Sequence, residues 1–158
     1  MAGDAPTARR VSDGPPGAIR PIAAAVIRDG DRLLVWEDHD PATGDVVCVP
    51  LAGGIEFGET GAEAVARELR EEIGQAPSAA RFVGFLEDIF DWNGQRRHEL
   101  WLVYDVDLAG DDLSHAEEVV VHEDDGTSYV AHWRGLDELG GPARRLVPDG
   151  LLDLLRDA

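Results

Sequence analysis

Lysine is absent from this chain of 158 residues, cysteine occurs once, and aromatic residues make up only 6% of it. The single cysteine, Cys48, excludes an internal disulfide, and its place between two valines favours a buried thiol. The longest apolar run, residues 22–27, is far too short to span a bilayer, and the N-terminus lacks the apolar stretch of a secretory signal. We therefore expect a soluble cytoplasmic protein.

Positive charge comes from arginine alone, and 32 acidic residues against 14 arginines give a formal net charge of −18. Such a surface repels nucleic-acid backbone and anionic lipid, so neither polymeric nucleic acid nor a membrane is expected as a partner. If the substrate is itself an anion, divalent cations are the usual means of cancelling the repulsion. The charge thus favours a metal site, although most of these carboxylates are expected only to solvate the surface.

The length suits one domain, and residues 1–18, rich in Ala, Gly and Pro, predict a loose tail before a single domain over residues 19–158. Short apolar runs predict strands, and an apolar period of 3.6 residues predicts a helix. The expected strands are 19–28, 32–37, 46–49, 81–92, 95–108, 119–123 and 127–133, and the expected helices are 61–73, 136–139 and 151–155. Pro50 is expected to end the third strand, and Asn93-Gly94 to turn a hairpin.

The most informative segment is a glycine-rich loop that leads into the expected helix 61–73. Glu68, Glu71 and Glu72 have the spacing i, i+3 and i+4, which projects their side chains from one face of a helix. Like charges so placed destabilise a helix unless a cation lies among them, and oxygen-only ligands suit Mg²⁺ or Mn²⁺. Three glutamates alone are more often a solvated acidic face, so this interpretation needs support from the rest of the segment.

That support comes from the wider spacing, which resembles the signature box of the Nudix hydrolases. The positions of the box are filled by Gly53, Glu59, Arg67, Glu68, Leu69, Glu71, Glu72 and Gly74. An accidental match has a chance on the order of one in a million with this composition. Two positions differ from the family, because Gln75 replaces an aliphatic residue and Leu51-Ala52 stand where the family often has Pro-Gly.

The resemblance implies an α/β (α+β) fold, an α/β/α sandwich around a mixed, partly antiparallel sheet. It also implies Mg²⁺-dependent hydrolysis, with Mn²⁺ as a substitute, of a nucleoside diphosphate linked to a group X. The implied metal ligands and catalytic residues are Glu68, Glu71 and Glu72, with Arg67 holding the carboxylates and Glu59 accepting from Arg67. Gly53, Gly54 and Gly58 would form the sharp loop near the metal, with Ala52 as a candidate backbone ligand.

Residues outside the box are candidates for the general base and for substrate binding. The base is either Glu68 or a glutamate outside the box, for which the candidates are Glu117, Glu118 and Glu123. Each of these three is more often a solvated surface carboxylate. Arg96, Arg97 and His98 follow the expected turn and are candidates for contacts with the substrate. Alternation places His98 on the face of Leu100 and Leu102, which favours a histidine at the edge of the core.

Three functions are compatible with this sequence. The leading hypothesis is a pyrophosphohydrolase that converts a nucleoside or deoxynucleoside triphosphate into the monophosphate and pyrophosphate. The second is the same chemistry on ADP-ribose, another nucleotide sugar or a dinucleoside polyphosphate. The third is a Nudix domain that senses a nucleotide without cleaving it, which the intact box disfavours. In each case the partner is a small nucleotide, and the protein is expected to be a monomer or a homodimer.

Overall fold

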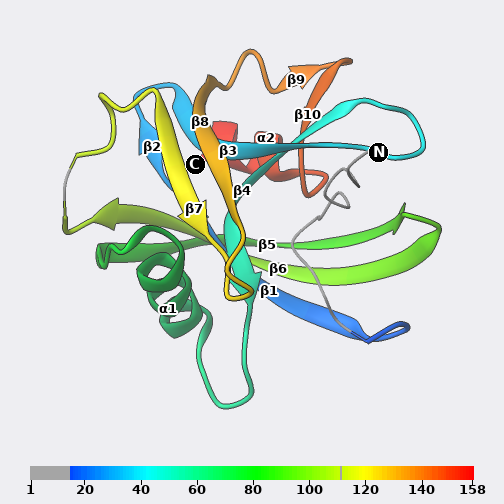
Figure 1. The fold of residues 1–158 in the computed structure, drawn as a ribbon, viewed down its shortest axis with the longest axis horizontal. Helices are drawn as coiled ribbons and strands as arrows, with labels where there is room; N and C mark the ends of the chain where they lie inside the picture. Colours follow the sequence, from blue (N-terminus) through cyan, green and yellow to red (C-terminus); the bar gives the residue numbers. More distant parts are fainter. Residues whose placement is uncertain (1–14, 111) are drawn as a thin grey trace.

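The computed structural model describes residues 15–110 and 112–158, so most of the expected tail lies outside the described residues. These residues form a 10-stranded sheet and the helices α1 and α2 (Figure 1). The elements are β1 (Ile19–Val26), β2 (Arg28–Asp29), β3 (Arg32–His39), β4 (Val46–Gly54), α1 (Gly61–Ile73), β5 (Pro77–Trp92), β6 (Gln95–Leu108), β7 (Glu118–His122), β8 (Ser128–Gly135), β9 (Gly140–Gly141), β10 (Arg144–Leu146) and α2 (Leu151–Asp157).

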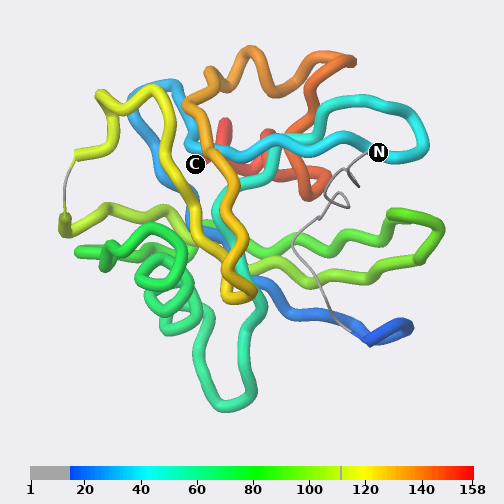
Figure 2. The backbone as a smooth tube through the Cα atoms, viewed as in Figure 1, coloured from blue at the N-terminus to red at the C-terminus, as the bar shows by residue number. Residues whose placement is uncertain are grey.

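The sheet is mixed, with the main strand order β5-β6-β1-β4-β3-β8-β7. β1 runs parallel to β6, and β10 runs parallel to β4, whereas the other paired strands are antiparallel. Figure 2 shows the long β5–β6 hairpin extending away from α1. The predicted α+β class with a mixed, partly antiparallel sheet is therefore confirmed.

The two helices cover opposite faces of the sheet. On one face α1 approaches β6, where Gly61 lies against the ring of Tyr104. On the other face α2 approaches β5, where Leu154 lies against Gly84. Each face carries its own apolar cluster, one that includes Ala64, Val65 and Leu69 of α1 and one that includes Leu151 and Leu155 of α2. This arrangement is the expected α/β/α sandwich.

Helix α1 has a defined beginning and end, as its sequence predicts. The side chain of Thr60 accepts a hydrogen bond from the backbone N–H of Glu63, and the Glu63 carboxylate accepts one from the N–H of Thr60. This capping box satisfies backbone donors that the first turn leaves unpaired. Gly74 ends the helix at φ 67°, a left-handed conformation that glycine adopts without steric cost. The helix therefore presents its glutamates from a fixed starting point.

The structure corrects two sequence expectations and confirms the turn at Asn93-Gly94, where both residues have positive φ. β4 continues past Pro50. Pro50 is the last residue of β4 that pairs with β3, and Leu51 is the first that pairs with β1. The N–H that proline lacks is tolerated at this change of partner strand. Residues 136–139 form a turn and no helix, because the chain enters β9 directly afterwards. Within the described part of the chain, neither helix has the length and apolar character needed to cross a membrane.

Candidate active site

The loop between β4 and α1 brings the box residues together. Gly53 is the second-last residue of β4, and the carboxyl group of Glu68 lies directly against its Cα. A methyl group at this position would overlap that carboxyl group, so only glycine permits the contact. Gly54 follows with its carbonyl oxygen turned toward Arg67. The strand end and the helix are thus packed closely enough for backbone and carboxylate oxygens to share one site.

Arg67 holds this arrangement through several charge-assisted hydrogen bonds. It donates to both carboxylate oxygens of Glu59, at 3.1 and 2.6 Å, to Glu68 Oε1 at 2.7 Å and to the carbonyl of Gly54 at 2.9 Å. Glu71 lies 3.6 Å from the same guanidinium group. The hydrogen bonds from Arg67 lower the pKa of Glu59, and those to Glu59 and Glu68 raise the pKa of Arg67. Arg67 therefore fixes one carboxylate of the helix and the position of the loop.

Glu72 is the most strongly perturbed acid near this site. It is 4% exposed, and burial, followed by the charge of Glu68, raises its pKa from the ordinary 4.5 to about 9. Its Oε2 atom is buried without a hydrogen-bond partner. Burial also raises the pKa of Glu68, although Arg67 opposes that rise. Two adjacent buried carboxyl groups are unfavourable when ionised unless a cation or a proton lies with them.

The β7–β8 hairpin supplies a further acid to this region. β7 packs against α1, and the charge of Glu123, just after β7, contributes to the raised pKa of Glu72. Burial and the charges of Glu72 and Glu123 raise the pKa of Tyr129, which places the phenol beside both acids. Glu123 is therefore the outside candidate that the fold brings to the box.

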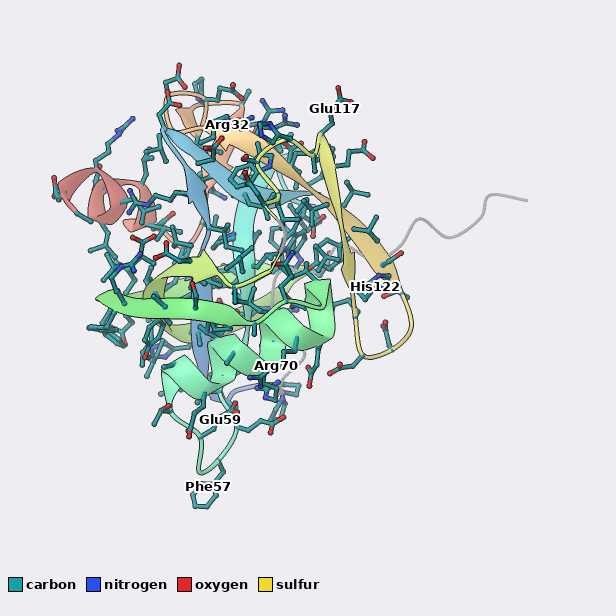
Figure 3. All side chains as sticks on the ribbon, turned by 90° about the vertical axis from the view of Figure 1, so that its left-hand side faces the viewer. Arg32, Phe57, Glu59, Arg70, Glu117 and His122 are labelled. Carbon is teal, nitrogen blue, oxygen red and sulfur yellow. The ribbon has the colours of Figure 1, made fainter. Side chains whose placement is uncertain are left out.

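The other two outside candidates lie away from the box. Glu117 and Glu118 are exposed, at the beginning of β7 and opposite the end that carries Glu123. Figure 3 shows Glu117 at one end of the molecule and Glu59 near the other. Neither residue is among the causes of the raised pKa of Glu72 or of Glu68. The structure therefore separates them from the box glutamates.

The donor set fits a hard divalent cation, although the side chains do not already form a complete coordination shell. Among residues 15–110 and 112–158, no three Asp, Glu, His or Cys side chains are grouped closely enough to hold a metal ion as they lie. The fit rests on the unpartnered Oε2 of Glu72 and on its buried contact with Glu68. Glu71 is exposed, one helical turn after Glu68 and directly before Glu72, so rotation of its side chain would add a third carboxylate.

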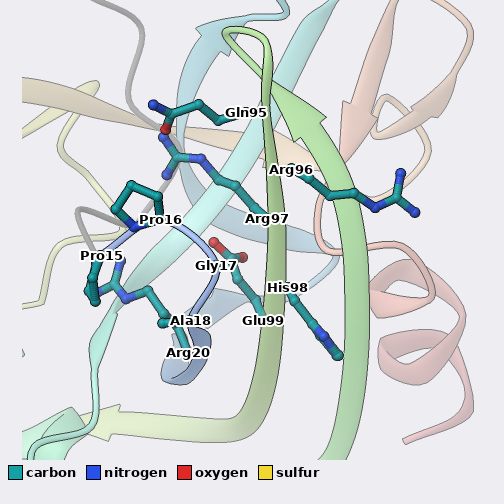
Figure 4. A pocket seen from close by; sticks show the side chains of 10 residues that line it. All are labelled: Pro15, Pro16, Gly17, Ala18, Arg20, Gln95, Arg96, Arg97, His98 and Glu99. Carbon is teal, nitrogen blue, oxygen red and sulfur yellow. The ribbon is translucent and has the colours of Figure 1, made fainter.

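The candidate substrate residues at the beginning of β6 point in different directions. Arg96, Arg97 and His98 all line one cavity of about 30 Å³, together with Arg20 and Glu99. The side chains of Arg96 and Arg97 leave β6 on opposite sides, and that of Arg96 is largely exposed and lies 3.8 Å from Asp91 (Figure 4). His98 pairs with Glu87, at 2.9 Å between Nε2 and Oε2. The structure therefore brings Arg96, Arg97 and His98 to one cavity, although their side chains do not converge on one point.

The remaining loop candidates lie on either side of Gly53 and Gly54. Ala52 is buried and pairs with Ala24 of β1. Gly58 has φ 87° in the exposed loop before α1, a conformation that L side chains rarely adopt. Both positions thus shape the path of the chain into the helix.

Sequence reasoning missed two residues, Tyr129 and Arg20. A methyl group at Gly54 would lie 3.3 Å from the guanidinium group of Arg20, so this arginine borders the box loop. Its position depends on the pairing of β1 with β4, and that of Tyr129 depends on the contact of β7 with α1. No local pattern signals either long-range contact.

Comparison with known proteins assigns this chain to a family. The NUDIX domain matches residues 18–153, and the chain therefore belongs to this family. It is 34% identical over 103 residues to the ADP-ribose pyrophosphatase of Methanocaldococcus jannaschii, a match that covers 61% of this chain and 58% of that protein. The chain thus aligns with less than two thirds of that relative.

Solved structures with the same fold are more distant in sequence. The MutT NUDIX hydrolase from Burkholderia pseudomallei has a TM-score of 0.61 and 24% identity, over 89% of this chain and 99% of that one. The E. coli ORF135 protein has a TM-score of 0.59 and 22% identity, over 91% of this chain and 94% of that one. These likenesses show the fold.

Proposed function

We propose that this protein is a Mg²⁺-dependent hydrolase that cleaves the phosphoanhydride of a nucleoside diphosphate linked to a group X. The observation that carries the proposal is the buried contact of Glu68 and Glu72, in which one oxygen of Glu72 has no partner. Nudix hydrolases generally use a divalent metal, and Mn²⁺ has the same preference for oxygen ligands. A domain that only senses a nucleotide has no need of this acid pair together with the Arg67 contacts.

In this proposal Glu68, Glu71 and Glu72 hold the cation. When bound, Mg²⁺ neutralises charge on the phosphate oxygens and makes water more acidic. Arg67 keeps Glu68 in place against Gly53, and Glu59 keeps Arg67 in place. Glu123 is the proposed general base that accepts a proton from the attacking water, because the fold places it beside Glu72 and outside the Arg67 contacts. Glu68 is the alternative base.

Two substrate classes follow from different observations. The relative named ADP-ribose pyrophosphatase favours ADP-ribose or a similar nucleotide sugar or dinucleoside polyphosphate. Arg20 lies beside Gly54 and lines the same cavity as Arg97. This arrangement favours a triphosphate, because its terminal phosphate would bind the two guanidinium groups. We rank the ADP-ribose class first, because the relative's name is the more specific observation.

A substrate panel with product identification tests this proposal. ADP-ribose should give AMP and ribose 5-phosphate, whereas a deoxynucleoside triphosphate should give the monophosphate and pyrophosphate, in each case with oxygen from labelled water in one product. If Arg97 binds a terminal phosphate, Arg97→Ala should lower kcat/KM for triphosphates about ten- to a hundredfold and leave ADP-ribose turnover nearly unchanged.

Arg96→Ala is the matched control, because Arg96 neighbours Arg97 and lines the same cavity, but its side chain is largely exposed beside Asp91 and points to the other side of β6 (Figure 4). Equal losses in both variants would remove Arg97 from the proposed site. Tight nucleotide binding without turnover of any member of the panel, at saturating Mg²⁺ or Mn²⁺, would instead establish the sensing function.

A further inference from the structure

Large exposed apolar side chains gather on one face of the molecule. Among the described residues six such side chains are exposed, and four of them lie on β1 and β5: Ile19 at 57%, Phe82 at 58%, Phe85 at 54% and Ile89 at 49%. We call the surface formed by these four residues, with Leu100 and Leu102 of β6 between them, the hairpin face. An exposed apolar patch of this kind is often an interaction site.

The strand register shows that these residues share one face. Directly paired residues point to the same side of a sheet, and β5 pairs Phe82 with Tyr104, Phe85 with Leu102 and Ile89 with His98. Tyr104, Leu102, Leu100 and His98 alternate along β6, so all four point to one side. The irregularity between Phe82 and Gly84 lets two phenylalanines three residues apart share that side. Ile19 joins them because it pairs with His98.

Helix α1 covers only one end of this side of the sheet. Its first residue, Gly61, packs against Tyr104, whose ring contacts Phe82 at 5.6 Å between centroids. Beyond this contact β5 and β6 extend away from the helix (Figure 1). Leu100 and Leu102 remain only partly buried there. Two ionisable residues on this side, Glu87 and His98, pair with each other at 2.9 Å between Oε2 and Nε2. Asp91 and Arg96, which the same register places on this side near the hairpin turn, pair at 3.8 Å, so the hairpin face is apolar with two internally paired ionic contacts.

We propose that the hairpin face is the interface of a homodimer, in which two copies pack their β5–β6 faces together about a two-fold axis. Half-exposed side chains of this size present roughly 400 Å² of apolar surface from the four exposed residues alone. Together with the half-buried leucines and a polar rim, this approaches the roughly 800 Å² per partner of a standard interface. A two-fold contact uses the same patch on both subunits, which is the commonest arrangement of homo-oligomers.

Charge and composition favour a second copy over other occupants. The net charge of −18 opposes binding to an anionic membrane surface, which requires basic residues. Residues 1–14 contain only Met1 and Val11 as large apolar side chains, so their sequence offers little to cover two phenylalanines and two isoleucines. A second hairpin face, by contrast, presents the same apolar residues and no unpaired charge among those named.

Sedimentation velocity of the full chain tests the proposal over about 1 to 100 μM, the range in which a moderate dimer dissociates. Wild type should sediment as a dimer at the upper end. Phe85→Glu and Ile89→Glu should each raise the dissociation constant about a hundredfold, since a buried charge at an interface centre acts on the scale of a hot spot. Both side chains are about half exposed, so both variants should keep the melting temperature of the monomer fold.

Val120→Glu is the matched control, because Val120 is a large apolar residue of similar exposure, at 50%, on β7 and outside the hairpin face. It should leave the dissociation constant unchanged within about twofold. A wild type that stays monomeric at about 100 μM would overturn the proposal. Equal weakening by Val120→Glu and Phe85→Glu would also overturn it, because added charge alone would then explain the effect.

Salt gives an independent readout. Each copy carries −18 charges, so long-range repulsion opposes association and screening should lower the dissociation constant as ionic strength rises from about 0.05 to 0.5 M. Dissociation of the dimer by salt would assign the contact to ion pairs elsewhere on the surface and overturn the apolar interface.

Deletion of residues 1–14 gives a further test. A variant without these residues that still dimerises would support the hairpin face as the interface, and loss of the dimer in that variant would place the contact in the deleted segment and overturn the proposal.

Discussion

At the scale of single residues, the position of Glu72 links burial to the proposed chemistry. Its carboxyl group is buried beside Glu68, its Oε2 has no hydrogen-bond partner, and burial and the charge of Glu68 raise its pKa. Protonation relieves this repulsion at low pH, and a bound cation would relieve it at neutral pH while keeping the charge. Glu71, one residue before it, is exposed and lacks this constraint. The three glutamates of the box are therefore not equivalent.

The first prediction concerns Glu72→Gln. The amide keeps the shape of the protonated acid but cannot supply a charged ligand, so hydrolysis should fall about a thousandfold or more while the fold is retained. Steady-state kinetics with saturating Mg²⁺ measures the loss, and circular dichroism checks the fold. Full activity of a folded Glu72→Gln variant would remove this residue from the metal site.

The second prediction separates the two candidates for the general base. Glu123→Gln should lower kcat about a hundred- to ten-thousandfold and abolish the acidic limb of the pH–rate profile, because a general base must be ionised. Glu118→Gln is the control, since Glu118 is exposed at the other end of β7 and should retain activity within about twofold. If Glu123→Gln keeps both the rate and the pH profile, the base is Glu68.

At the scale of elements, the site depends on how β4, α1 and the β7–β8 hairpin approach one another. β4 ends in Gly53-Gly54, and the carbonyl of Gly54 is bound by Arg67 of α1. β7 packs on α1 and brings Glu123 to Glu72. The helix contributes the acids, the strand permits their close approach, and the hairpin adds an acid from far along the chain.

The third prediction tests the close approach at Gly53. In Gly53→Ala the new methyl group would overlap the Glu68 carboxyl group, so Glu68 must move away from Arg67 and from Glu72. We expect activity to fall about a hundredfold, on the scale of a misplaced catalytic group, with a higher Mg²⁺ requirement. Gly54→Ala is the matched control, because its methyl group would meet only the movable end of Arg20. Metal titrations that give both variants the same midpoint would contradict the prediction.

Local patterns predicted the elements whose cause is local. Helix α1 follows from its apolar period, and the β5–β6 turn follows from Asn93-Gly94. The continuation of β4 past Pro50 was not predictable, because it depends on which neighbours the strand pairs with. The positions of Tyr129 and Arg20 likewise depend on contacts between distant segments. The box spacing predicts three acids on one side of α1, but it predicts neither that Glu71 is exposed while Glu72 is buried nor that Glu123 lies beside Glu72.

At the scale of the whole molecule, the NUDIX domain match covers residues 18–153. We propose that residues 19–158 form this single domain and that the preceding tail is dispensable for activity. Deletion of residues 1–14 tests this and should leave kcat and the melting temperature nearly unchanged. A large loss of stability would show that the deleted residues belong to the folded unit.

The last prediction concerns the pH dependence of stability in the metal-free protein. The folded-state pKa of Glu72, about 9, lies above its ordinary 4.5, so folding takes up a proton in this range. The stabilising contribution is complete below pH 4.5 and is lost as the pH rises through 9. The raised pKa of Glu68 contributes to the pH dependence of stability with the same sign. The pKa of Glu59 is lowered, so Glu59 stabilises the fold above its ordinary pKa of 4.5 and loses that contribution at acid pH.

The melting temperature of the metal-free protein should therefore fall by about 5 °C or more between pH 6 and pH 9, and Glu72→Gln should reduce this fall because its side chain stays neutral. Mg²⁺ binds the ionised carboxylates, so it should raise the melting temperature more at pH 9 than at pH 6. NaCl at the same ionic strength controls for screening of the net charge of −18. Identical pH slopes in wild type and Glu72→Gln would show that Glu72 is not the group that titrates, because the net charge acts equally on both proteins.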